Sequence, residues 1–129
     1  MSKRLDENLS GSENDGLIVA GTPTTDIFSV TVRHGQGILT RGTILAISST
    51  EDSMVMLGTD ADGGETLTAN CILADDTDTG ETSDIFATAY RVGHFNRNAI
   101  ITKDDYTLSA TDEEELRKGG ILLSDALNY

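Results

Sequence analysis

The stretch at residues 85–101, IFATAYRVGHFNRNAII, constrains the fold more than any other part of the sequence. Successive side chains of a β-strand point to opposite faces, and the first half of the stretch alternates in this way. The two predicted faces are Phe86, Thr88, Tyr90 and Val92, and Ile85, Ala87, Ala89 and Arg91. A glycine inside a strand is typical of a bulge or a close backbone approach, so Gly93 predicts a corner over residues 94–98 before the chain resumes at 99–102.

The composition favours a small, mainly β domain. A chain of 129 residues fits one domain, in which about two-thirds of the unfolded surface is buried on folding. Aromatic residues make up 5% and tryptophan is absent, so the core must be mostly aliphatic. Thirteen glycines and a single proline are typical of a turn-rich β protein. The lone cysteine, Cys71, lies in an apolar run and is predicted to be a buried small hydrophobic residue.

The charge balance excludes several classes of partner. Nine basic residues stand against twenty-two acidic ones, giving a formal net charge of −13. This charge repels phosphate backbones and anionic lipid, so we expect no nucleic-acid and no membrane partner. No apolar run approaches the roughly 18 residues of a membrane span, and the first residues lack a signal-peptide hydrophobic region. The expected location is therefore a cytoplasm.

The N-terminal segment differs from the rest of the chain. Residues 1–16 are polar, and Leu5 and Leu9 are their only large apolar side chains. Such a segment cannot bury enough surface to offset its ordering entropy, so we predict a flexible arm over residues 1–25 and a domain over 26–129. The apolar run at 17–20 is either an edge strand of that domain or a segment that pairs with a partner's sheet. The sequence does not choose between the two.

The remaining elements follow from local patterns. Residues 26–33 alternate as a half-buried strand, and apolar runs predict further strands. These are residues 38–39, 43–48, 54–57 and 67–74. A capping box from Thr111 to Glu114 predicts a helix of about two turns, which ends at Gly119. The apolar run at 121–123 is then a last strand or an anchoring segment.

Catalytic and metal-binding patterns are weak. The acidic loops at Asp60 and Asp76 do not match the twelve-residue calcium loop, because its closing glutamate position falls on Cys71 and Ala87. The two histidines, His34 and His94, lack the paired spacing of a zinc site. We therefore expect no catalytic residue, cofactor or metal. One alternative is a small acidic hydrolase or metal-dependent enzyme in which either histidine meets carboxylates, and another is a β-barrel adaptor of some other assembly.

Three segments together carry a resemblance. They are VTVRHGQGILTRGTIL at residues 30–45, AYRVGHFNRNAI at 89–100 and ELRKGGILL at 115–123. Their order gives a strand entering a glycine-rich turn and Arg-Gly-Thr-x-Leu, then Gly-x-x-Asn, then a short helix leading to a terminal Gly-Ile segment. This order, over roughly residues 26–127, resembles the head decoration proteins of tailed phages, the lambda-type capsid stabilising family.

The resemblance implies a fold and a function. The fold is mainly β, a compact β-barrel-like (tulip-like) domain with one or two short helices and an extended N-terminal arm. The function is that of a homotrimeric cement protein without a small-molecule substrate, assembled in the host cytoplasm and placed on the outer surface of the virion capsid. It binds the major capsid protein at three-fold and quasi-three-fold positions of the expanded head and stabilises the shell against DNA pressure.

The resemblance also implies where the contacts lie. The segment at 17–25 occupies the position at which such proteins add a strand to the major capsid protein's sheet. The implied capsid-binding residues are Leu17, Ile18, Val19, Ala20, Thr22, Thr24 and Phe28. Possible contacts with a neighbouring subunit are His94, Phe95, Asn96 and Arg97. Deleting residues 1–25 is expected to leave the domain folded and to abolish capsid binding.

Overall fold

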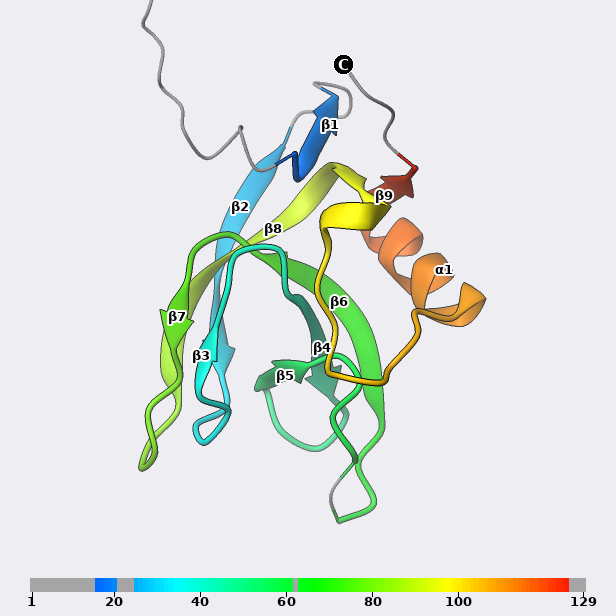
Figure 1. Cartoon of the computed structure of the whole chain (residues 1–129). Coiled ribbons are helices and arrows are strands. Elements are labelled where there is room, and N and C mark those ends of the chain that lie inside the picture. Colours follow the sequence, from blue (N-terminus) through cyan, green and yellow to red (C-terminus); the bar gives the residue numbers. More distant parts are fainter. Residues whose placement is uncertain (1–15, 21–24, 62, 126–129) are drawn as a thin grey trace, which may run out of the picture.

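The computed structural model describes residues 16–20, 25–61 and 63–125, and within them the chain is mainly β (Figure 1). Five strands form a closed barrel, as the resemblance implied. In order around the barrel they are β2 (Asp26–Val32), β5 (Met54–Met56), β4 (Ile44–Ser48), β6 (Leu67–Leu73) and β8 (Ile85–Asn96). The barrel closes because β6 pairs with β8 at Ile72–Tyr90 and Leu73–Ala89.

Strand β8 organises the whole molecule. Its first half lies in the barrel, antiparallel to β2. Its second half extends beyond the barrel between two short strands, β1 (Ile18–Ala20) and β9 (Ile121–Ser124) (Figure 1). The run at 121–123 is thus a last strand, which pairs in parallel with β8.

The predicted corner at residues 94–98 is wrong. Strand β8 continues through Gly93 to Asn96, and the chain turns in the short 3-10 helix Arg97–Ala99. Position 93 is a glycine because the Phe95 ring lies close to its backbone: a Cβ atom at this position would lie only 2.7 Å from Cζ of Phe95. The bulge in β8 comes earlier, where Asp26 and Ile27 face Val92 and Tyr90.

Exposure varies along one of the two predicted strand faces. Phe86 is 79% exposed whereas Tyr90, which was assigned to the same face, is buried. The barrel closure explains the difference, because β6 pairs with β8 at Tyr90 and the Arg41 guanidinium lies 5.3 Å from the Tyr90 ring centre. Phe86 lies on β8 before the segment that β6 covers.

The helix α1 (Ala110–Gly119) begins one residue before the predicted cap. Its N-cap is Ser109, not Thr111: the Asp112 amide donates to Ser109 Oγ at 3.1 Å, and the Ser109 amide donates to Asp112 Oδ2 at 3.0 Å. The Tyr106 hydroxyl also donates to Asp112, which fixes this carboxylate at the cap. The residue in the left-handed conformation that ends the helix is Gly120, with φ 111°, rather than the predicted Gly119.

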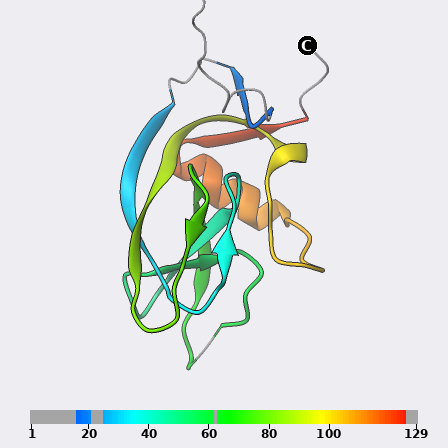
Figure 2. The same cartoon turned by 60° about the vertical axis from the view of Figure 1, so that its left-hand side comes forward.

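A separate two-stranded ribbon and an aliphatic core complete the fold. Strand β3 (Ile38–Leu39) was predicted and pairs with β7 (Thr77–Asp78), which was not (Figure 2). The core is mostly aliphatic, as expected, and Cys71 is buried within it. Burial raises the pKa of the Cys71 thiol to about 12, because the thiolate would lose its hydration. Cys71 is therefore an unreactive packing residue.

Candidate functional site

The two groups of residues implied by the resemblance lie side by side in space. Strand β1 pairs antiparallel with the end of β8, so that Ile18 faces Phe95 and Ala20 faces His94. The Asn96 amide donates to the Leu17 carbonyl at 2.8 Å. Residues far apart in the sequence thus form one end of the molecule, opposite to the barrel end that carries the β2 to β3 turn (Figure 1).

The capsid-binding candidates differ in their accessibility. Leu17 is 1% exposed and belongs to the domain's own core, whereas Ile18 and Val19 are half-buried. Phe28 is half-buried on β2, and the Arg91 guanidinium lies 5.9 Å from its ring centre. Ala20 pairs through β1, and Thr22 and Thr24 lie outside the described residues. Their role in capsid binding stays a prediction.

Strand β1 offers its backbone on one side. Within the described residues it pairs with β8 alone, so it forms an edge of the sheet. An edge strand presents outward-pointing N–H and C=O groups, which are the groups that another strand pairs with. The apolar run at 17–20 therefore contains an edge strand of the domain, and among the described residues one side of this strand has no pairing strand.

The candidates at 94–97 are tied to neighbouring elements. His94 Nε2 lies 2.8 Å from Ser124 Oγ on β9, and the Asn98 amide donates to Asn96 Oδ1 at 2.9 Å. Phe95 is fully buried, with its ring 5.3 Å from that of Tyr90. Its side chain therefore packs inside the domain rather than on the surface.

Arg97 is the most extensively bonded of these residues. Its guanidinium donates to Glu113 of α1 at 2.8 and 3.1 Å, to Asp125 at 2.8 Å and to the Leu123 carbonyl at 3.4 Å. These carboxylates raise the pKa of Arg97, the hydrogen bonds to Glu113 being the largest cause. Arg97 therefore joins the 3-10 helix to α1 and to the end of β9.

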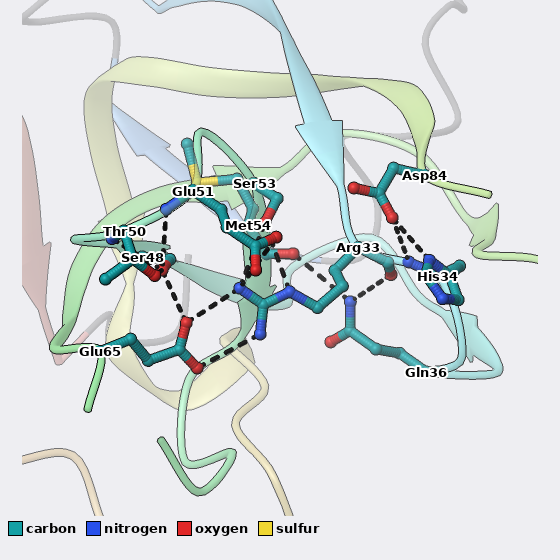
Figure 3. A network of polar contacts seen from close by, with 10 residues as sticks. All are labelled: Arg33, His34, Gln36, Ser48, Thr50, Glu51, Ser53, Met54, Glu65 and Asp84. Atoms are coloured by element: carbon teal, nitrogen blue, oxygen red, sulfur yellow. Dashed lines mark hydrogen bonds and ion pairs between the residues drawn. The ribbon is translucent and has the colours of Figure 1, made fainter. Parts of the chain in front are cut away.

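A second polar network lies at the other end of the barrel (Figure 3). Glu65 accepts two hydrogen bonds from Arg33, at 3.0 and 3.2 Å, and one from Ser48 at 2.6 Å. The Arg33 guanidinium also donates to Ser53. The network joins the end of β2 to β4, β5 and the loop before β6, so its role is structural. Sequence reasoning missed Glu65, which stands in an unpatterned polar loop.

The same region contains the histidine and carboxylate that the enzyme alternative requires. His34 Nδ1 lies 2.6 Å from Asp84 Oδ1, and the His34 amide donates to the same oxygen at 3.1 Å. These two hydrogen bonds lower the pKa of Asp84. The serine hydroxyls drawn nearby are bonded to other groups, Ser53 to Arg33 and Ser48 to Glu65 (Figure 3). The described residues contain no group of three potential metal ligands and no helix able to span a membrane.

The described residues thus form a small closed barrel with β1 as an edge strand and with a polar network at each end. The family model for the bacteriophage lambda head decoration protein D matches residues 10–122, and the chain belongs to this family. Members of the family are structural proteins of the phage capsid rather than enzymes, so the hydrolase alternative is set aside. Membership places this protein on the phage capsid, as the resemblance implied. A search of curated proteins found no match.

Proposed function

We propose that this protein is a capsid cement that binds the outer surface of the expanded head as a trimer. The trimers occupy three-fold and quasi-three-fold positions, bind the major capsid protein and stabilise the shell against internal DNA pressure. The observation that carries the proposal is the open edge of β1, which pairs with β8 on one side only within the described residues.

The mechanism is strand addition. A strand of the major capsid protein that pairs with β1 or with the residues next to it gains main-chain hydrogen bonds, which demand little of side-chain identity. Ile18, Val19 and Phe28 are half-buried and so keep apolar surface for the partner. Thr22 and Thr24 continue the docking segment, and Leu17 anchors the base of the arm in the domain.

Trimer formation strengthens this attachment. One arm that orders on binding loses conformational entropy, so a single copy binds weakly. Three arms on one trimer raise the effective concentration of the second and third contacts, which increases avidity without a new type of contact. The net charge of −13 is compatible with this arrangement, because the partner is the outer shell and not the packaged genome.

Two truncations and one double substitution test the arm. Deletion of residues 1–25 is expected to abolish binding to expanded heads, but it also removes the buried Leu17 and β1, so a lower unfolding midpoint is expected. Deletion of residues 1–15 keeps β1 and isolates the part of the arm before it. The double variant T22P/T24P keeps Leu17 and removes two amide donors, and it is expected to weaken binding.

Sedimentation of heads with each purified variant measures binding, and circular dichroism confirms that each variant is folded. Undiminished binding by the folded 1–25 deletion would overturn the arm mechanism. Electron microscopy of expanded heads with and without the protein tests the position. Added density at three-fold positions is expected, and added density elsewhere would contradict the proposal.

A further inference from the structure

The outer face of the β2 and β8 pair carries exposed side chains in the described part of the chain. Five side chains form it, and they are called here the β2–β8 outer face: Ile27, Ser29, Thr31, Phe86 and Thr88. Thr31 lies directly opposite Phe86 and Ser29 directly opposite Thr88, so these side chains share one side of the sheet. In Figure 2 β2 (blue) and the first half of β8 (yellow-green) lie side by side on the left-hand side of the molecule.

This face holds the two most accessible large apolar side chains of the barrel. Phe86 is 79% exposed and Ile27 is 54% exposed. Val30, Val32, Ala87 and Ala89 on the same strands are buried, so the exposure is a property of the outer face and not of loose packing. An aromatic side chain this accessible is typical of a protein contact, because aromatic residues are enriched in interfaces relative to the rest of the surface.

The face also lacks charge. In a chain with 24% charged residues, none of its five side chains is charged. Carboxylates next to its two ends have partners: Asp26 pairs with Arg91 at 2.8 Å, and Asp84 lies 2.6 Å from His34 Nδ1. Two copies of a chain with a net charge of −13 repel each other, and the repulsion is smallest where uncharged surfaces meet. A second copy of this acidic chain therefore meets less repulsion at this face than at the charged surface around it.

We infer that a second copy of this chain covers the β2–β8 outer face, with Phe86 as the anchor of the contact. The inference rests on the proposed trimer and specifies where its subunits meet. A closed ring of three uses a head-to-tail contact, so Phe86 of one copy packs against a different surface of the next copy. Burial of one aromatic side chain near the centre of such a contact supplies a large share of the binding energy.

Two pairs of variants test the inference by sedimentation equilibrium at physiological ionic strength. Phe86→Ser removes the anchor, and Leu122→Ser removes an exposed apolar side chain from β9 as its control. Thr88→Glu adds a charge to the face, and Thr107→Glu adds the same charge to an exposed loop position. We expect Phe86→Ser and Thr88→Glu to raise the dissociation constant of self-association at least about tenfold, and both controls to leave it within about twofold.

The outcomes separate this inference from the proposed function. Self-association of Phe86→Ser equal to that of the wild type would overturn the inference, and so would a wild type that stays monomeric at all concentrations. Weaker binding of Phe86→Ser to heads with unchanged self-association would assign the face to the capsid protein and also overturn it. Binding of the wild type to heads is measured in a separate experiment, so failure of the subunit-contact inference can be distinguished from failure of the proposed cement function. Thermal unfolding of Phe86→Ser verifies its fold.

Discussion

Arg97 binds Glu113 through two hydrogen bonds, Nη2 to Oε1 at 2.8 Å and Nε to Oε2 at 3.1 Å. This pair connects the 3-10 helix after β8 with the first turn of α1. Both side chains are about one-third exposed, so solvent weakens the attraction. The paired geometry nevertheless makes it stronger than a mobile surface ion pair.

The first prediction concerns this contact. Arg97→Ala is expected to lower the free energy of unfolding by about 1 kcal/mol, because Glu113, Asp125 and the end of β9 lose a shared donor. Urea denaturation of the free protein measures the change. Arg91→Ala is the control, since its pair with Asp26 is more exposed, and its cost is expected to be about 0–0.5 kcal/mol. Equal losses of unfolding free energy in the two variants would contradict the claim that Arg97 stabilises the fold more than an exposed ion pair does.

The second prediction concerns the network at the other barrel end. Glu65 is buried and binds both Arg33 and Ser48. Glu65→Ala leaves a partly buried guanidinium without this partner, and we expect a loss of about 2–3 kcal/mol in the free energy of unfolding. Glu51→Ala is a matched control, because Glu51 is exposed and lies 3.9 Å from the same guanidinium. A control cost approaching that of Glu65→Ala would show that burial does not determine the effect.

The third prediction is a pH dependence. The hydrogen bonds from His34 lower the pKa of Asp84 in the folded state. A carboxyl group of this kind stabilises the fold above its unfolded pKa of about 3.9, and the contribution is lost as the pH falls through the lower folded value. The destabilisation by Asp84→Asn is therefore expected to be larger at neutral pH than below the folded pKa. Chemical denaturation across that range measures it.

Asp104→Asn serves as the control for this pH dependence, because it removes an exposed loop carboxylate and the same negative charge. Relative to this control, Asp84→Asn is expected to flatten the acid limb of the stability curve. An acid limb identical in the two variants would contradict a contribution from the Asp84 and His34 pair.

Local patterns predicted most of the barrel strands. Residues 26–33 alternate cleanly and form β2, and the apolar runs at 43–48, 54–57 and 67–74 form β4, β5 and β6. Their antiparallel neighbours follow from short connections. Strand β7 was missed because two residues carry no periodicity. Barrel closure was not derivable from these patterns, since β6 meets β8 through a non-local pairing.

The site was only partly accessible to sequence reasoning. The run at 17–20 was identified, but a four-residue apolar run has no period that decides whether it faces its own core or a partner. The structure places Leu17 inside and keeps the strand at an edge. Arg33 and Glu65 are 32 residues apart, so no spacing rule joins them. The assignment of capsid-binding and subunit-contact residues stays a prediction.

The last prediction concerns Gly93, which combines an unusual backbone conformation with a close contact. Its φ is 156°, and an added Cβ would lie 2.7 and 2.8 Å from Cζ and Cε2 of Phe95. The Phe95 ring is fully buried and cannot move aside without disturbing the core. Gly93→Ala is therefore expected to lower the free energy of unfolding by at least about 2 kcal/mol.

The control and a double variant identify the cause of this effect. At Gly119, the last residue of α1, an added Cβ meets nothing within 4 Å, so Gly119→Ala is expected to be neutral or to stabilise by up to about 1 kcal/mol. Phe95→Leu removes the ring and leaves space for the new methyl group. Combined with Gly93→Ala, it is expected to cost less than the sum of the two single variants, because both act on one contact. Strict additivity of the two costs in urea denaturation would instead assign the destabilisation to the backbone conformation at position 93. The contact with the Phe95 ring would then not be the reason why β8 requires a glycine there.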